Sequence, residues 1–387
     1  MILLLITLLL LVPYVILIIY YRQSWLQQKE YNLPQEKLSE NTTFISVIIS
    51  ARNEEKNIGR CIESIIKQSY PANLFEVLIV DDHSVDSTPA IVNSFHKENI
   101  SLIKLSDYTE NVELNSYKKK AIETGIGLAK GNLIVTTDAD CIVKPEWLKT
   151  IAAYYEENEL AFIAAPVAYF DASRAEPVFK KFFKIFQSLD FMALQGITGA
   201  SVYKKIHNMC NGANLAYEKK VFYEVNGFEG IDNIASGDDM LLMHKIQKKY
   251  RGKIGYLKSP NVIVQTHQSE SIKEFINQRI RWASKADKYP DIKITIVLFL
   301  VYFLNIWILF IAVYSIFYPQ YFYLLLLLII VKTTSELFFL FPVCKFFEKQ
   351  KLLWWFIPCQ LFHIIYTLIA GWLGKFGSYT WKERKVK

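Results

Sequence analysis

The sequence predicts an α/β domain that is flanked by membrane-spanning helices. Strand and helix patterns alternate from residue 44 to about 270, both ends of the chain are strongly apolar, and two aspartates follow a short apolar strand in the middle. Hydrophobic residues make up 52% of the 387 residues, more than an ordinary soluble domain carries. We therefore expect an N-terminal anchor, a water-exposed α/β domain and a C-terminal membrane region.

Residues 1–21 carry no charged side chain and are long enough to cross a bilayer. They lack a basic n-region and a small-residue cleavage site, which argues against a cleaved signal peptide. Arg22 and Lys29 follow the segment and nothing basic precedes it, so the positive-inside rule places the rest of a 22–43 linker in the cytoplasm. We expect a multi-pass protein of the inner or plasma membrane with a cytoplasmic catalytic domain at 44–270.

Residues 292–373 contain about three apolar segments, which we expect at 292–318, 321–343 and 352–373. Lysines before the first and after the second place those ends in the cytoplasm. The third segment conflicts with this rule, because the basic tail 374–387 would lie outside after a full crossing. Either that segment re-enters or lies along the interface, or the rule fails here.

Cysteine use and charge restrict the partners. The five cysteines form no Cys-x-x-Cys pair and no metal-ligand cluster, as is typical of a reduced cytoplasmic compartment. The formal net charge is +7, and the basic residues follow the membrane-proximal loops. Anionic lipid explains this excess better than nucleic acid, so we expect a lipid bilayer and no nucleic acid among the partners.

Within the central domain, β-branched runs and helical spacing predict alternating elements. Thr88 and Pro89 are a good N-cap and first residue for one of the helices, and Gly131 stops another. The expected elements are strand 44–50, a helix from Ile58 to Ile66, strand 76–80, a helix from Thr88, helix 117–130 and strand 132–137.

Carboxylates follow the predicted strands. Asp138 and Asp140 stand at the end of strand 132–137, where the ligands of open α/β sheets bind. They could clamp a hard divalent cation that holds a substrate diphosphate. Asn53 and Glu54 follow the first strand, and two more aspartates, Asp81 and Asp82, follow the second. A nucleotide across these ends needs such polar groups, although turns also favour Asn and Asp.

Two later segments carry further candidates. Asp239, with Asp238 as the alternative, could act as a general base, or the pair could merely cap the helix 240–249. The segment 271–290 reads as an amphipathic interface helix whose apolar stripe faces lipid. On its other side stand Gln278, Arg281 and Trp282. There, an arginine can pair with phosphate and a tryptophan can stack on a sugar, unless both simply anchor the helix at the interface.

Taken together, an aspartate after the second strand, Asp-x-Asp, an acidic pair that opens a helix and Gln-x-x-Arg-Trp occur in order. The chain thereby resembles the membrane-bound family 2 glycosyltransferases of the cellulose, hyaluronan and poly-N-acetylglucosamine synthase type, over about residues 44 to 290. The resemblance implies a GT-A (Rossmann-like) nucleotide-sugar-binding domain flanked by transmembrane helices.

The resemblance also implies roles for individual residues. Asp82, with Asp81, would contact uridine, and Asn53 and Glu54 match the opening nucleotide loop. Lys118 matches a family lysine, although tyrosine replaces the glycine that usually precedes it.

Asp138 and Asp140 match the metal–diphosphate motif, with Asp140 the more direct ligand of Mg²⁺ or Mn²⁺. Asp239 matches the catalytic base, but the family usually has Glu-Asp after Thr or Ser where this chain has Gly237-Asp238-Asp239. That departure leaves the choice between Asp238 and Asp239 open.

The remaining matches concern the acceptor side. Gln278, Arg281 and Trp282 match the motif that holds the diphosphate and the acceptor end. Asn214 belongs to a small-residue loop, 210–215, that resembles the loop lining the acceptor side in this family. A plain turn is the alternative interpretation of that loop.

The implied activity is inverting, metal-dependent transfer of a sugar from a nucleotide-diphospho-sugar, expected to be UDP-linked, to a saccharide or lipid-linked acceptor in cell-surface polysaccharide or glycolipid synthesis. An oligomer or an accessory export subunit could supply the further spans that a polymer channel needs. The alternatives are a non-processive, ceramide glucosyltransferase-like enzyme, a glycoside hydrolase, and a transport or scaffold protein. The transport or scaffold interpretation rests on Lys332 and Glu336, whose spacing inside a span suggests mutual pairing.

Overall fold

The computed structural model describes residues 1–33, 43–109, 116–173, 176–234, 236–285, 291–377, 379–381 and 384–386. The chain divides into two compact units. One, here called the membrane unit, comprises Met1–Gln28, Asp171–His207 and Gln268–Lys387; the other, the sheet unit, comprises Lys29–Phe170 and Asn208–His267. The expected linker and basic tail lie partly outside the described residues.

These units do not coincide with the ranges expected from the sequence. Residues 171–207, expected inside the 44–270 domain, group with the apolar helices instead. They form the long helix α6 (Val178–Lys204), most of which is buried from Phe183 to Val202. This segment contains lysines as well as a long apolar run, so its sequence did not indicate which of the two units it belongs to.

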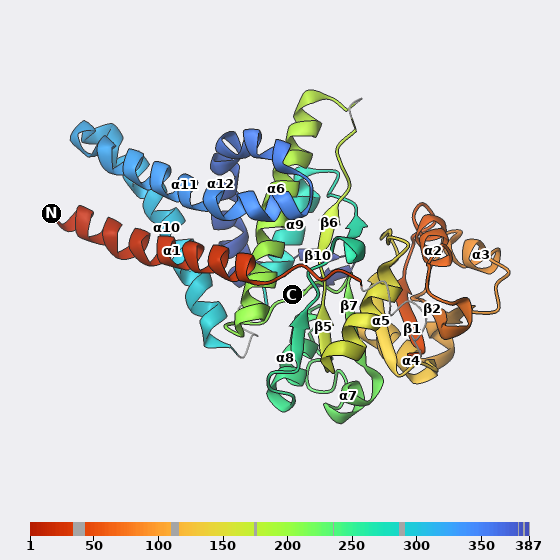
Figure 1. Cartoon of the computed structure of the whole chain (residues 1–387). Helices are drawn as coiled ribbons and strands as arrows, with labels where there is room; N and C mark the ends of the chain where they lie inside the picture. Colours follow the sequence, from red (N-terminus) through yellow and green to blue (C-terminus); the bar gives the residue numbers. More distant parts are fainter. Residues whose placement is uncertain are drawn as a thin grey trace. The chain divides into compact units, whose positions relative to one another are not determined.

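The sheet unit is built on a seven-stranded sheet with the order β3-β2-β1-β4-β7-β5-β8 (Figure 1). Neighbouring strands are parallel except that β7 runs antiparallel to both β4 and β5. The strands are β1 (Ile45–Ala51), β2 (Phe75–Asp81), β3 (Ile100–Lys104), β4 (Leu133–Asp138), β5 (Phe162–Ala164), β7 (Leu215–Glu218) and β8 (Ile254–Tyr256). This mixed α/β architecture confirms the predicted fold class.

The register of the central strands brings candidate residues to one edge. Ala51 pairs with Asp81, and Ser50 pairs with Asp138. β2 and β4 therefore end beside the last residues of β1, each on an aspartate. The β-branched runs predicted these strands to within about one residue, and the structure extends them onto the aspartates themselves.

Helices cover the sheet. α4 (Tyr117–Leu128) packs on β1 and β2, and Gly125 permits the approach: a Cβ there would lie 2.7 Å from Ile48 Cγ2. The other helices of this unit are α2 (Ile58–Ile66), α3 (Thr88–Asn93), α5 (Trp147–Asn158), α7 (Lys219–Glu224) and α8 (Met240–Lys249). A second, two-stranded sheet pairs β6 (Val167–Tyr169) with β9 (Val264–Thr266).

The membrane unit contains helices long and apolar enough to cross a bilayer. Among the described residues there are four by length and composition, and they contain α1 (Ile2–Gln27), α10 (Ile292–Phe317), α11 (Phe322–Phe346) and α12 (Phe356–Phe376). α1 and α11 lie side by side and run in the same direction, since Tyr14 donates to Glu336 and Trp25 packs against Phe346.

Lys332 and Glu336, the two charged residues inside α11, form the ion pair that their spacing predicted. Lys332 Nζ lies 2.7 Å from Glu336 Oε1. Gln360 of α12 extends the pair, because it accepts from Lys332 at 2.8 Å and donates to Glu336 at 2.7 Å. Tyr14 completes the network. Each charge is therefore neutralised within the helices.

The amphipathic segment forms α9 (Ile272–Ala283), capped by the Ser271 hydroxyl. Part of its apolar stripe packs on protein, whereas Ile272 at the start of the helix is 51% exposed. Phe275 is buried and its ring contacts Phe183 and Phe186 of α6 and Tyr366 of α12. Helical spacing identified the apolar face correctly, but the partner of that face is protein.

Candidate active site

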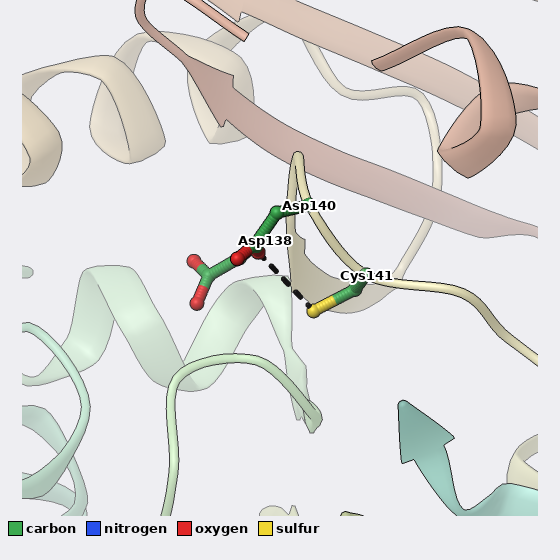
Figure 2. Close-up of side chains that lie close together, drawn as sticks. All are labelled: Asp138, Asp140 and Cys141. Atoms are coloured by element: carbon green, nitrogen blue, oxygen red, sulfur yellow. Dashed lines mark hydrogen bonds between the residues drawn. The ribbon is translucent and has the colours of Figure 1, made fainter. Parts of the chain in front are cut away.

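The site begins with the two aspartates at the end of β4. Asp140 is largely buried, and Thr266 of β9 donates to its Oδ2 at 3.0 Å. Figure 2 shows Asp138, Asp140 and Cys141 close together; one ligand atom from each lies within 4.8 Å of the others. Burial, the Asp138 charge and the Glu54 charge raise the pKa of Asp140 to about 6.

The donor set fits a hard divalent cation. Two carboxylates at this separation repel one another, and a cation removes that cost. Cys141 does not fit as a ligand of a hard cation, which prefers oxygen over thiolate sulfur. Burial and the nearby Asp140 and Asp138 charges raise the pKa of its thiol well above the usual value, and the thiol donates to Asp140 Oδ1, 3.7 Å away. Asp138 and Asp140 are the residues that would hold Mg²⁺ or Mn²⁺.

Lys118 connects the aspartates to the acidic pair. Its Nζ lies 2.7 Å from Asp138 Oδ1 and 3.3 Å from Asp238 Oδ2. Burial alone would lower the pKa of Lys118, but the Asp138 and Asp238 carboxylates outweigh it and raise the pKa. The side chain thus remains an ammonium that bridges β4 and the loop before α8.

The two aspartates of the acidic pair, Asp238 and Asp239, make different contacts. Asp239 caps α8, with Oδ1 accepting from the Met240 amide at 2.7 Å. Its Oδ2 accepts from the Gly212 amide at 3.1 Å, so the carboxylate is fixed by backbone on both sides. Asp238 instead pairs with Lys118. A Cβ on Gly212 would lie 3.4 Å from Asp238 Oδ2, which places the small-residue loop directly against the pair.

The loops after β1 and β2, which the sequence predicted to bind nucleotide, meet beside the end of β2. Asn53 adopts the left-handed conformation, φ 52°, and accepts through Oδ1 from the Val85 amide at 3.0 Å. Glu54 donates its amide to Thr88 Oγ1 at 2.7 Å. These bonds fasten the loop after β1 to the loop after β2.

Both aspartates after β2 are buried. The Asp82 carboxylate lies 3.0 Å from His83 Nδ1 and 3.7 Å from Arg52 Nη1. Asp81 Oδ2 accepts from the Ser84 amide at 3.4 Å, whereas Asp81 Oδ1 accepts no hydrogen bond from the described residues. A buried carboxylate oxygen without a donor is costly unless a ligand supplies one.

Asn214 is a correction to the sequence-based assignment. It is fully buried, and its Oδ1 accepts from Trp147 Nε1 at 3.0 Å. Its Nδ2 donates to the carbonyls of Pro166 and Val262 at 2.8 and 2.7 Å. The amide therefore ties the start of β7 to its neighbours and does not line an open surface for substrate.

Asn214→Ala is expected to destabilise the fold by about 3 kcal/mol or more, because three buried polar partners lose their bonds at once. Thermal unfolding of the detergent-solubilised protein would measure this as a lowered Tm. Asn211→Ala is the matched control: it lies in the same loop, is only half-buried, and accepts one local bond, from the Ala213 amide. Equal Tm losses in the two variants would contradict the assigned role.

Gln278, Arg281 and Trp282 lie on α9 in the membrane unit. Sequence reasoning missed Arg279, a buried residue that lies between them on the same helix. Its guanidinium pairs with Asp190 of α6 at 2.6 Å, donates to Gln278 Oε1 at 2.9 Å and lies 4.2 Å from the centre of the Trp282 ring. Tyr366 also donates to Asp190. The buried ion pair thus fixes two of the three motif side chains.

Part of the chain matches a known family model. Residues 46–225 match the family model described as glycosyl transferase family 2. Over these residues the chain is similar to a family 2 glycosyltransferase domain. The matched segment contains the loops after β1 and β2, Lys118 and both β4 aspartates, and it ends before the acidic pair.

Curated relatives match parts of the chain. Glycosyltransferase AglE of Haloferax volcanii is 33% identical over 108 residues, which are 27% of this chain and 33% of that protein. The dolichyl N-acetyl-alpha-D-glucosaminyl phosphate 3-beta-D-2,3-diacetamido-2,3-dideoxy-beta-D-glucuronosyltransferase of Methanococcus voltae is 26% identical over 250 residues, 62% of this chain and 72% of that protein. The match therefore spans only about a third of the first of these relatives.

A solved structure extends the likeness of fold. Mannosyltransferase PcManGT from Pyrobaculum calidifontis, in complex with GDP-Man and Mn²⁺, superposes with a TM-score of 0.56 at 16% identity. The superposition covers 95% of this chain and 97% of that one. The likeness of fold therefore extends over nearly the whole chain.

Proposed function

We propose that the protein is an inverting, metal-dependent glycosyltransferase that moves a sugar from a nucleotide-diphospho-sugar to a saccharide or lipid-linked acceptor at the cytoplasmic membrane face. The observation that carries the proposal is the Lys118 bridge, because it joins the Asp138 end of the cation site to the Asp238–Asp239 pair. Donor and acceptor chemistry then take place within one cluster of charges.

Donor binding rests on the loops after β1 and β2. Asp81 Oδ1 offers a buried acceptor for a base N–H or a ribose hydroxyl, and Asp82 is oriented for the same purpose by His83 and Arg52. The Pyrobaculum enzyme in complex with GDP-Man and Mn²⁺ supports a nucleotide-diphospho-sugar donor and a divalent cation. We propose a uridine diphosphate sugar, with a guanosine diphosphate sugar as the competing donor.

The transfer step follows from the residues around the cluster. A divalent cation held by Asp138 and Asp140 would supply charge neutralisation for the departing diphosphate. Asp239, with Asp238 as the alternative, accepts the proton of the acceptor hydroxyl. The acceptor oxygen then bonds to the anomeric carbon on the face opposite the departing diphosphate, which leaves with the electron pair of the broken bond. The configuration at that carbon is thereby inverted.

The acceptor side draws on α9. Arg281 would pair with the diphosphate and Trp282 would stack against the acceptor sugar, with Gln278 beside them. The Methanococcus relative is named for a dolichyl phosphate-linked acceptor sugar, which supports single transfer to a lipid-linked saccharide over processive polymer synthesis. A transport role draws little support, because the Lys332–Glu336 charges are already neutralised within the helices. Assembly into an oligomer or with an export subunit remains part of the polymer alternative.

The function is tested by incubating purified protein with UDP- and GDP-sugars, lipid-linked acceptors and Mn²⁺ or Mg²⁺. We expect release of nucleoside diphosphate together with a β-linked product from an α-linked donor. Failure to release nucleotide from every donor, with and without acceptor, would contradict the proposal.

Asp81→Asn is expected to weaken binding of the nucleoside diphosphate about tenfold to a hundredfold, since a hydrogen bond to a charged group contributes about 1.5–3 kcal/mol. Isothermal titration with UDP and with GDP measures this loss and identifies the preferred base. Asp107→Asn, which changes an exposed carboxylate of the same unit, should bind as the wild type does. Unchanged affinity in Asp81→Asn would place the base elsewhere.

A further inference from the structure

α12 has two chemically distinct faces. Its buried face packs against other helices and includes Phe356, Cys359, Gln360, Ile364 and Ala370. Its exposed face is apolar at intervals of three or four residues, which makes one continuous stripe along the helix. We call this the α12 stripe; its members are Ile357, Leu361, Ile365, Ile369, Trp372 and Phe376.

Contacts at two points of α12 define its direction relative to the spanning helices. Near its start, Gln360 hydrogen-bonds Glu336 of α11, about 15 Å along the axis from the end of α11 at Phe346. Further on, a Cβ at Gly371 would lie 2.6 Å from the Tyr302 ring of α10, about 15 Å from the start of α10 at Ile292.

Those two reference ends belong to the same side of the membrane, because α10 and α11 are joined at their other ends by a short 3₁₀ turn, Pro319–Tyr321. Gln360 and Gly371 are about 16 Å apart along α12. The residues that they contact on α11 and α10 nevertheless lie at about the same distance from that side of the membrane. A helix that crossed the bilayer beside α10 and α11 would meet them at levels about 16 Å apart. α12 therefore runs across these helices.

α12 instead runs along α9. Phe275 contacts Tyr366 near the start of α9, and a Cβ at Gly374 would lie 2.7 Å from the Ala283 Cβ at its end. The two helices are thus parallel over this length (α9 and α12 in Figure 1). α9 carries Lys273, Glu274 and Arg281, charges that a helix keeps at the membrane surface rather than across the hydrocarbon core.

We propose that α12 does not cross the membrane but lies in the plane of one leaflet, with the α12 stripe against the acyl chains of the lipids. The leaflet is the one nearest the ends of α10 and α11 at Ile292 and Phe346. Lys351 precedes α12 and Lys375 lies in its last turn, both exposed; their long side chains can reach from the helix toward the membrane surface.

This arrangement removes the conflict between charge and topology. With three crossings, by α1, α10 and α11, the C-terminal tail returns to the side that holds Arg22. All the basic flanks then lie on one side, as the positive-inside rule requires. The proposal does not depend on the catalytic activity, so it can fail or succeed separately from it.

The depth of the α12 stripe is the most direct test. Bimane attached at single cysteines in place of Ile357, Ile365 and Trp372 is read in vesicles whose lipids carry nitroxides at a shallow or a deep acyl position. We expect the three positions to be quenched by the same nitroxide. The control is Ile296, Phe303 and Phe310, exposed along α10, where the preferred nitroxide should change along the helix. The same change along α12 would overturn the proposal.

The side of the tail provides a second, independent readout. A cysteine in place of Lys387 is reacted with a membrane-impermeant maleimide in sealed vesicles of one orientation. We expect it to react as a cysteine in place of Lys29 does, and opposite to one in place of Gln320, which lies between α10 and α11. Reaction in step with the Gln320 position would mean that α12 crosses, whatever the enzymatic state of the protein.

Discussion

Asp239→Asn is expected to lower turnover by about 10²–10⁴-fold, the usual contribution of a general base, while leaving the affinity for the nucleoside diphosphate nearly unchanged. An amide keeps an oxygen for the Met240 amide, so α8 retains its cap. The variant loses the capacity to accept a proton, together with the bond from the Gly212 amide to the second oxygen. Steady-state kinetics measures turnover, and nucleotide titration measures affinity on the same preparation.

Asp238→Asn is the matched variant, since it changes the neighbouring residue of the same pair. Its carboxylate pairs with Lys118, so its loss should alter how Lys118 is held and hence the affinity for the diphosphate. A fall in turnover confined to Asp238→Asn, with normal turnover in Asp239→Asn, would transfer the base assignment to Asp238.

Asp140→Asn should reduce both Mn²⁺ affinity and transfer, the latter by about 10³-fold, because charge neutralisation by a metal contributes several kcal/mol to such a transition state. Asp140, one of the two proposed ligands, is oriented by Thr266. Electron paramagnetic resonance of free Mn²⁺ gives the binding constant without any turnover. Chelation of the metal in the wild type should reproduce the loss of activity.

Cys141→Ser separates the carboxylates from the thiol. The thiol lies in the same group, but Mn²⁺ prefers carboxylate oxygen over thiolate sulfur, so its replacement should leave Mn²⁺ affinity and transfer near wild-type values. A loss of Mn²⁺ affinity equal to that of Asp140→Asn would contradict a site made of oxygen ligands alone.

The sheet and its functional edge were predictable because local chemistry determines them. β-branched runs ended at Asp81 and Asp138, and parallel pairing with β1 aligned those ends. The contact between Lys118 and Asp238 joins residues far apart in the chain. Asp238 was proposed from its own motif, but only the resemblance pointed to Lys118. The pairing of Lys332 with Glu336 followed from helical spacing alone and is confirmed.

Other features depended on tertiary contacts that no local pattern encodes. Asn214 sits in a loop of small residues that suggested a substrate surface, but Trp147 and two remote carbonyls occupy its amide. The stripe of α9 was visible in the sequence, yet its covering by α6 and α12 was not. Arg279 was missed because its partner, Asp190, lies on a helix that the sequence assigned to another domain.

The Lys118 bridge means that the protein carries its own substitute cation. The ammonium offsets the repulsion between the Asp138 and Asp238 carboxylates, so these carboxylates can stay close together without any other positive charge. A divalent cation held by Asp138 and Asp140 would add a second positive charge to this cluster, and Lys118 would keep its contact with Asp238.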